Sequence, residues 1–469
     1  MTERRAAWLL IVLAVVARGA AVLVLQSHLV PHSTYEHGEI AANLLAGKGF
    51  SVRFLGADGP TSQQAPVYPL VVAAAYAVGG VGTPRALLIL ELGQALLGGV
   101  LVAGVMALAR EAAPTSRRTA YAAALIASVH PTLVYAATHV QVALWAATML
   151  VWVLVLGYRT GRTGRDRDAL LGGGLLGLLV LTDPILGLSA AGFAWAAFRG
   201  DEARLSNARR LALAGLAALV VLAPWTWRNY RVHGEFVAVK STFGYAFWQG
   251  NCSLSNGTDK VIRPSVDRAL AQARAGGGFD LKGWNASLWK ARHEAGYLDD
   301  IALTADDYRE LSSLNEPARS RLLFARAVAD LRADPWRYPL LCGRRLAAFV
   351  FWDDANPKAR SLVYRAGQVG LTLAALLGLV LAPRDLRRRL GPTLLTALLV
   401  ALFHSLTIVS VRFHVPIEPL MALWAASALA RAEAPAAAEG PRLSGDHTPA
   451  RSVSPGRSRR RRRLPRSSS

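Results

Sequence analysis

Residues 32–69 read HSTYEHGEIAANLLAGKGFSVRFLGADGPTSQQAPVYP and form a long polar stretch directly after the first apolar run of the chain. Two carboxylates in this stretch, Glu36 and Glu39, are spaced so that a helix would place both on one face. An acidic pair beside a membrane can act as a general base on an acceptor hydroxyl or amine. A solvated helix face explains the same spacing, and the spacing alone leaves both interpretations open.

The composition indicates a membrane protein. The chain has 469 residues, of which 53% are hydrophobic and only 18% are charged, and its mean hydropathy is +0.29. Apolar runs of roughly 18–25 residues recur along it, which is the length that a membrane-spanning helix needs. The first run, residues 6–26, has no evident cleavage site and is predicted to stay as a signal anchor. We therefore expect an all-α integral membrane protein.

The net charge of +22 would suggest nucleic-acid binding in a soluble protein. Here much of the arginine lies in short loops between apolar runs and in the tail, which is the pattern of cytoplasmic loops. We therefore expect no nucleic-acid partner. The same pattern predicts cytoplasmic N- and C-termini in the inner (cytoplasmic) membrane, and it places the polar loop 27–84 on the outer face.

The charge pattern predicts about ten spans, with an additional surface or re-entrant helix at residues 69–80 in the first outer loop. A Thr182-Asp183-Pro184 break divides one long apolar run, because Pro184 ends the first helix and Asp183 caps the second. The predicted spans cover about residues 6–26, 85–109, 120–137, 140–158, the two halves of 170–198, 211–225, 362–381, 392–409 and 416–429.

Four sections follow from this topology. Residues 1–226 form an N-terminal transmembrane module, and residues 227–352 form an outer region. That region is predicted to hold a small α-rich domain, with a helix at 316–331 and an interfacial amphipathic helix at 340–352. Residues 353–432 form a C-terminal transmembrane module, and residues 433–469 form a disordered, basic cytoplasmic tail that can touch anionic membrane lipids.

Several polar residues lie where burial is costly. Arg18 and Glu91 fall inside predicted spans, where they either line a substrate path or pair structurally. His130, His139 and Asp183 fall near outer helix ends, but no regular metal-ligand spacing joins them. We therefore expect no cofactor, although a divalent metal stays open. The sequence also leaves open whether its two cysteines, Cys252 and Cys342, form a disulfide.

Arg412 is the lone Arg or Lys of the predicted outer turn VSVRFHVPIEP, and two prolines should stiffen that turn. A guanidinium suits a phosphate, but snorkelling to lipid headgroups or pairing with Glu418 are alternatives. Arg228 and Arg231 alternate with aromatic residues near the end of the seventh span, where they also suit a lipid phosphate. An aromatic belt at the membrane surface explains those aromatic residues equally well.

Five strings occur in the order seen in bacterial membrane glycosyltransferases of the GT-C fold, and the chain resembles those related to protein O-mannosyltransferases and aminoarabinose transferases. The resemblance runs from the first span to the last and leaves out the tail and most of the outer region. The strings are YEHGEIAANLLAGKGF (35–50), APVYPLVVAAAY (65–76), LTDP (181–184), APWTWRNYRVHGEFVAVKSTFGYAFWQGN (223–251) and RFHVPIEPL (412–420).

The resemblance implies a GT-C-like bundle and a polyprenyl-phosphate sugar donor. The sugar would move to a lipid, glycan or protein acceptor on the outer face, in one inverting displacement. The family's first-loop base corresponds to Glu36, with Glu39 second, and its donor-phosphate cations correspond to Arg412 and Arg228. Many relatives carry Asp in this loop, whereas this chain has none before Phe54. A second acidic pair and further pocket-lining candidates complete the predicted site: Asp353, Asp354, Tyr35, His37, Arg18, Glu91, His139 and Asp183.

A polytopic transporter or lipid flippase is the main alternative. Such proteins also need many spans and intramembrane charges, and they often show internal repeats with helices broken at corresponding places. This sequence shows no such repeat, and its large outer region lies on one side. A non-enzymatic scaffold would need neither Glu36 nor Arg412.

Overall fold

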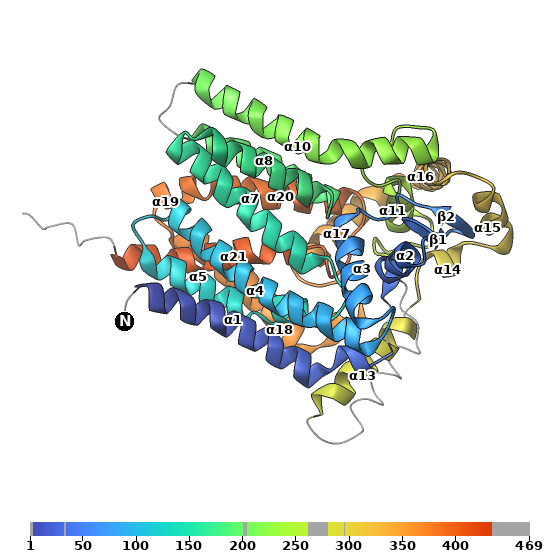
Figure 1. Ribbon diagram of the computed structural model, residues 1–469, viewed down its shortest axis with the longest axis horizontal. Coiled ribbons are helices and arrows are strands. Elements are labelled where there is room, and N and C mark those ends of the chain that lie inside the picture. Colours follow the sequence, from blue (N-terminus) through green and yellow to red (C-terminus); the bar gives the residue numbers. More distant parts are fainter. Residues whose placement is uncertain (1–2, 32–33, 200–203, 261–279, 295, 434–469) are drawn as a thin grey trace, which may run out of the picture. The chain divides into compact units, whose positions relative to one another are not determined.

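The computed structural model describes residues 3–31, 34–199, 204–260, 280–294 and 296–433. The predicted cytoplasmic tail lies outside the described residues. Within them, helices dominate, and the long ones run side by side as a bundle (Figure 1). Five described helices are long and apolar enough to cross a membrane: α1 (Glu3–Leu25), α4 (Pro84–Ala112), α7 (Ala143–Thr163), α10 (Arg204–His233) and α18 (Leu362–Leu381).

Shorter helices complete the bundle, and they include apolar helices of 10–17 residues. The number of spans therefore stays a prediction, although α18 matches its predicted range. The bundle's main core is built from small and branched residues of α4, α7 and their neighbours. The shorter elements are α3 (Val67–Gly79), α5 (Arg117–Val129), α6 (Pro131–Tyr135), α8 (Asp166–Val180), η2 (Pro184–Leu188), α9 (Ser189–Phe198), α19 (Arg384–Arg389), α20 (Gly391–Leu406), η4 (Val415–Ile417), α21 (Glu418–Ala426) and η5 (Ser427–Glu433).

Prolines and a capping aspartate set several of the helix ends. The predicted break between α8 and α9 is confirmed, and Asp183 caps η2 by accepting a hydrogen bond of 3.3 Å from the Ile185 amide. A continuous helix over 120–137 was wrong, because Pro131 ends α5 at Val129. Helix α10 instead continues through Pro224, so the predicted aromatic–basic cluster lies on its last turns.

The remaining elements gather at one end of the bundle (Figure 1). An antiparallel β1–β2 pair, which was not predicted, has Val52 opposite Gly59. The helices predicted at 316–331 and 340–352 are confirmed as α16 and α17. The elements are η1 (Ser27–Leu29), α2 (Tyr35–Leu45), β1 (Ser51–Phe54), β2 (Ala57–Pro60), α11 (Phe243–Asn251), α13 (Leu281–Glu294), α14 (Asp299–Ala302), α15 (Ala305–Ser312), α16 (Glu316–Ala333), α17 (Arg337–Val350) and η3 (Pro357–Arg360).

The first polar loop and the outer region share one hydrophobic core, although about 200 residues separate them in sequence. Ile40 of α2 and Phe54 of β1 are buried with Trp248 of α11 and Leu323 of α16. Cys252 lies in the same core, and both cysteines of the chain are free thiols. The loop that carries Glu36 is therefore held against the outer region rather than standing alone.

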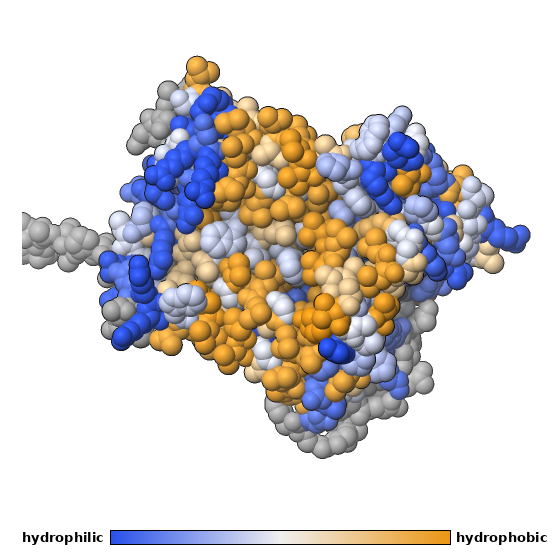
Figure 2. Space-filling model, viewed as in Figure 1, coloured by the Kyte–Doolittle hydropathy of each residue, from blue (hydrophilic) through white to orange (hydrophobic). Residues whose placement is uncertain are grey.

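Hydropathy separates the two ends of the bundle from its middle. In the view of Figure 2, an apolar band lies between two hydrophilic ends. Ion pairs between basic loops and helix termini gather at the end opposite the first polar loop. They join Arg117 to Glu3, Arg162 to Glu111, and Arg209 to Asp166. This arrangement agrees with an integral membrane protein whose basic loops share one side.

Candidate active site

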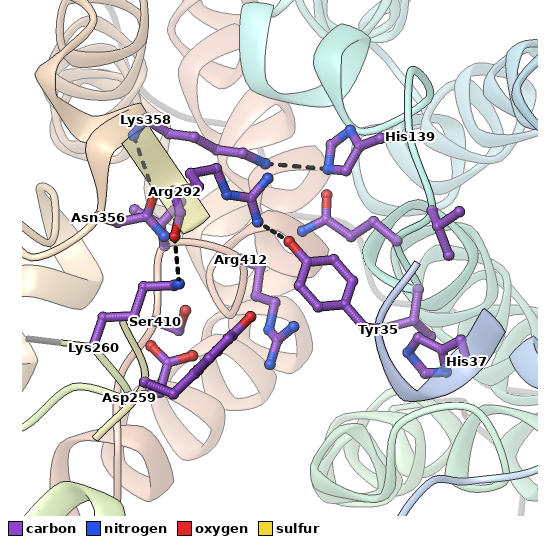
Figure 3. Close-up of a pocket in the computed structure, with 15 residues that line it drawn as sticks. Tyr35, His37, His139, Asp259, Lys260, Arg292, Asn356, Lys358, Ser410 and Arg412 are labelled. Carbon is purple, nitrogen blue, oxygen red and sulfur yellow. Dashed lines mark hydrogen bonds between the residues drawn. The ribbon is translucent and has the colours of Figure 1, made fainter. Parts of the chain in front are cut away.

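A polar cavity lies where the first loop, the outer region and the turn after α20 meet (Figure 3). Helix α2 contributes to it with its first turn, and α13 contributes with its last. Its lining brings together residues from six separate parts of the chain: Tyr35, His37, His139, Val140, Gln141, Val142, Asp259, Lys260, Arg292, Tyr297, Asn356, Lys358, Ser410, Val411 and Arg412.

Arg412, the predicted phosphate ligand, lines this cavity. Burial alone would lower the pKa of the guanidinium, but the nearby carboxylates of Asp259 and Glu36 raise it. The alternative partner, Glu418, is instead engaged by two histidines, with its Oε1 2.9 Å from His414 Nδ1 and its Oε2 3.5 Å from His130 Nε2. Arg412 is therefore free to present its charge to the cavity.

Three further cations line the cavity, and sequence reasoning singled out none of them. Lys358 is buried, and its pKa is well below the ordinary value because of burial and of its cationic neighbours Arg292, Arg412 and Lys260. Burial lowers the pKa of Lys260 to about 8; the charge of Asp259 opposes this shift, and the charges of Arg292 and Arg412 add to it. Cations that face one another in a buried cavity repel, so an anionic ligand would stabilise them.

Arg292 and Lys358 lie on an aromatic wall. The Arg292 guanidinium is 4.1 Å from the centre of the Trp289 ring, and Lys358 Nζ is 4.5 Å from that of Tyr135. Arg292 donates to the Tyr35 hydroxyl, while its Nε and Nη1 are buried without a hydrogen-bond partner. Lys358 Nζ is 3.1 Å from the Nε2 of the predicted pocket residue His139. These cations have donors left over for a ligand.

An apolar groove adjoins the cavity. It is lined by residues of the membrane helices α1 and α18, of the α5–α6 corner, and of α13. Lys358 and Arg412, together with Gln141 and Val411, line both spaces. A ligand with an anionic head and a long apolar tail fits this juxtaposition, because each part meets a surface of matching polarity.

The two first-loop carboxylates have different surroundings. Glu36 is half-buried, accepts a bond of 3.4 Å from Gln63 Nε2, and lies close enough to Arg412 and Lys240 to shift the pKa of each. Glu39 is exposed and accepts the Arg53 backbone amide at 2.8 Å. Glu36 and Glu39 therefore lie on the same helix but have different partners, and only Glu36 lies near the cations of the site.

Other acidic residues extend the site. Asp259 lines the cavity, is buried, and has no hydrogen-bond partner at Oδ1. Burial, then the charge of Asp259, raises the pKa of Asp353 to about 7. Its neighbour Asp354 is exposed and pairs with Arg365 at 2.8 Å. Asp183 is half-buried; burial raises its pKa, while Lys240 and Arg412 act in the opposite direction.

Tyr35 and His37 bring the start of α2 into the cavity. Tyr35 has φ of 54°, a left-handed conformation that side chains other than glycine rarely adopt. His37 is buried edge-to-face against Tyr68, with ring centres 4.9 Å apart. Burial, then the charges of Lys240 and Arg412, lowers the pKa of His37 to about 3, so its ring is neutral near pH 7.

Of the twelve predicted site residues, four line the cavity: Tyr35, His37, His139 and Arg412. The other eight do not: Glu36, Glu39, Asp183, Asp353, Asp354, Arg18, Glu91 and Arg228. The last three of these have structural partners elsewhere. Arg18 donates to the carbonyls of Ala127 and Ser128, both at 3.1 Å, at the end of α5. Glu91 lies 2.9 Å from His28 Nδ1, so Arg18 and Glu91 have separate partners. Arg228 donates to the carbonyls of Phe50 and Thr61 and lies 4.9 Å from the centre of the Trp225 ring. These side chains hold elements together.

The residues that sequence reasoning missed gave little local signal. Asp259 and Lys260 lie in a polar stretch of the outer region, Arg292 on an ordinary amphipathic helix, and Lys358 after a proline. The one usable signal was Lys358, a cation placed just before an apolar span. Among the residues that the structure describes, no group of three or more His, Cys, Asp or Glu side chains could hold a metal ion.

No protein-family model and no curated protein matches the sequence. Among solved structures, the chain resembles the archaeal oligosaccharyltransferase AglB from Archaeoglobus fulgidus in complex with an inhibitory peptide and a dolichol-phosphate. The TM-score is 0.51 at 16% identity, covering 90% of this chain and 50% of that one, so the chain spans about half of AglB's length.

ArnT from Cupriavidus metallidurans bound to undecaprenyl phosphate has a TM-score of 0.41 at 17% identity, covering 92% of this chain and 79% of that one. At these identities the comparison concerns the fold. The chain is an integral membrane protein whose fold is similar to that of the GT-C glycosyltransferases, as the sequence predicted.

Proposed function

We propose that the chain transfers a sugar from a polyprenyl-phosphate-linked donor to a lipid, glycan or protein acceptor. One observation carries this proposal: the cation-lined cavity adjoins an apolar groove between membrane helices, and Lys358 and Arg412 line both. A polyprenyl phosphate has the matching chemistry, with its charge at one end and a long hydrocarbon chain at the other. The dolichol-phosphate bound to AglB belongs to the same chemical class.

The donor phosphate would bind between Arg412, Lys358 and Arg292. The aromatic wall and His139 already orient the side chains of Arg292 and Lys358 before the lipid binds. Binding would therefore cost less side-chain conformational entropy. Charge-assisted hydrogen bonds to the phosphate would replace the mutual repulsion of the cations. Arg228 is not part of the proposed phosphate site, because its guanidinium donates to the carbonyls of Phe50 and Thr61.

Glu36 is the proposed general base. It accepts the proton of the acceptor nucleophile while the nucleophile attacks the anomeric carbon on the side opposite the phosphate. The bond between that carbon and the phosphate oxygen breaks, and its electron pair stays on the oxygen. Arg412 stabilises the charge that develops there. One displacement of this kind inverts the anomeric centre and needs no cofactor.

The proposed active site faces outward. Residues of the first loop and the outer region line the cavity. These two parts of the chain lie at one end of the bundle, and the paired basic loops lie at the other end (Figure 1). Cytoplasmic loops carry the excess of Lys and Arg, so the cavity would open at the outer face of the cytoplasmic membrane.

The test is sugar transfer from radiolabelled polyprenyl-phosphate sugars by purified variants. We expect Glu36→Gln to lose transfer by about 100-fold or more, which is the usual contribution of a general base. Arg412→Ala should lose a similar factor because it removes charge stabilisation. Glu310→Gln, at an exposed residue of α15, serves as the matched control.

Three results would count against these proposals. Asp259 lines the cavity and, like Glu36, is close enough to Arg412 to raise its pKa. An inactive Asp259→Asn beside an active Glu36→Gln would therefore move the base to Asp259. Full activity of both Glu36→Gln and Arg412→Ala would refute the site as a whole. A wild-type protein that transfers no sugar from any such donor would favour the transporter class.

A further inference from the structure

We propose that Glu316, in the first turn of α16, is a positioning residue for Glu36. This inference rests on the proposed function. Glu316 belongs to the outer region, does not line the cavity, and is buried. Its carboxylate bonds to the two chain segments that carry Gln63 and Lys240, both neighbours of Glu36.

The first segment is the end of the polar loop. The Thr61 hydroxyl donates to Glu316 Oε1, and the Ser62 backbone amide donates to Glu316 Oε2 at 2.8 Å. The next residue, Gln63, is buried and donates from Nε2 to Glu36 Oε1 at 3.4 Å. Glu316 thereby fixes the backbone from which Gln63 reaches Glu36.

The second segment follows α10. The Ser241 hydroxyl donates to Glu316 Oε2 at 2.8 Å, and the Ser241 amide donates to the Ser62 carbonyl at 3.0 Å. The preceding residue, Lys240, is a cation beside Glu36 and donates to Gln64 Oε1 at 3.1 Å. One carboxylate therefore holds the segments of Gln63 and Lys240, which are two of the three groups near Glu36. The third group, Arg412, lies on another turn.

A carboxylate suits this place better than a neutral side chain. Three donors converge on its two oxygens, and ionised carboxylates accept several hydrogen bonds. Its position in the first turn of α16 also places it at the positive end of the helix dipole. The Arg319 guanidinium lies near enough for electrostatic compensation, and His233 Nε2 is 3.8 Å away.

The donor-phosphate site is built from other elements, namely α13, η3 and the turn at 410–412. Loss of Glu316 should therefore lower kcat and leave the KM for the donor nearly unchanged. A displacement of about 1 Å at a reacting group costs on the order of 100-fold in rate. We expect Glu316→Gln to lower kcat by about 10- to 100-fold.

The first experiment is a double-mutant cycle on sugar transfer. If Glu316 acts through Glu36, Glu316→Gln should slow the wild type but have little further effect in a Glu36→Gln background, measured over long incubations. Ser241→Ala removes one of the three bonds, keeps the carboxylate, and should give a smaller loss with the fold intact. Glu310→Gln, exposed in α15, is the control, and the Tm of every variant is recorded.

A second readout does not need the reaction. Carbodiimide labelling followed by mass spectrometry measures the reactivity of the Glu36 carboxylate in the apo protein. We expect faster or slower labelling of Glu36 in both Glu316→Gln and Ser241→Ala, and the wild-type rate in Glu310→Gln. If the wild type transfers no sugar, the proposed function fails, while this labelling still decides whether Glu316 positions Glu36.

The inference is overturned by any of three results. One is wild-type kcat in a folded Glu316→Gln protein. Another is an equal fold-loss from Glu316→Gln in the wild-type and Glu36→Gln backgrounds, which would indicate a general structural role. The third is a Glu36 labelling rate that neither Glu316→Gln nor Ser241→Ala changes.

Discussion

Replacing Lys358 with methionine should affect the lipid-free and the lipid-bound protein in opposite directions. In the lipid-free protein, Lys358 is buried among the cations Arg292, Arg412 and Lys260. Burial and these charges disfavour its protonated form and hold its pKa well below the ordinary value. Methionine has a similar length and carries no charge. Removing Lys358 also removes its repulsion from these cationic neighbours. Even the replacement of a buried ion pair by apolar side chains of similar volume is often neutral or stabilising by about 1–4 kcal/mol. We therefore expect a higher Tm for lipid-free Lys358→Met.

Binding of the donor should weaken in the same variant. A hydrogen bond to a charged group contributes about 1.5–3 kcal/mol, so losing the Lys358–phosphate contact should cost about 2 kcal/mol. This corresponds to an affinity roughly 30-fold lower, since each 1.4 kcal/mol is a factor of ten. The bound lipid would then raise the Tm of the variant by less than it raises that of the wild type.

The assay is a thermal unfolding series in detergent with increasing undecaprenyl phosphate. Lys290→Met is the matched control, because Lys290 is exposed on α13 and should change neither Tm nor affinity. A lipid-free Lys358→Met protein that is less stable than the wild type and binds the lipid equally well would refute the reasoning. It would show that Lys358 is a structural cation rather than part of an anion site.

Two further predictions use other parts of the site. The folded protein keeps a proton on Asp353 up to about pH 7, whereas an ordinary Asp releases it near 3.8, because burial and then Asp259 raise its pKa. The free energy of unfolding should therefore fall between about pH 4 and pH 7 by up to about 4 kcal/mol, and Asp353→Asn should remove this fall when Tm is followed against pH. Arg228→Gln loses bonds to the Phe50 and Thr61 carbonyls, so it should cost about 1–3 kcal/mol of stability and leave affinity for undecaprenyl phosphate unchanged.

One result would contradict each of these two predictions. An equal slope of Tm against pH in the wild type and in Asp353→Asn would show that this carboxyl does not titrate between folded and unfolded states. A weaker lipid affinity of Arg228→Gln at unchanged Tm would return Arg228 to the phosphate site, where the sequence alone had placed it.

The first loop shows how far sequence reasoning reached. The helix that carries Glu36 and Glu39 exists, but a face shared along a helix says nothing of what lies opposite each residue. Gln63 and two cations lie near Glu36, whereas Glu39 caps the Arg53 amide. The same limit applies to Arg228, which the sequence suggested as a phosphate ligand. The sequence around an arginine near a membrane surface is the same whether its guanidinium binds a phosphate or backbone carbonyls.

What the sequence determined by itself was local in character. Apolar runs set the membrane helices, Pro131 and Pro184 set helix ends, and Asp183 caps η2, because these effects act within a few residues. The tertiary structure alone decided that Lys358, Arg292 and Asp259 lie around Arg412 and that Glu316 holds the neighbours of Glu36. These groups are far apart in the chain, and only the packing of the outer region on the first loop brings their charges within reach of one another.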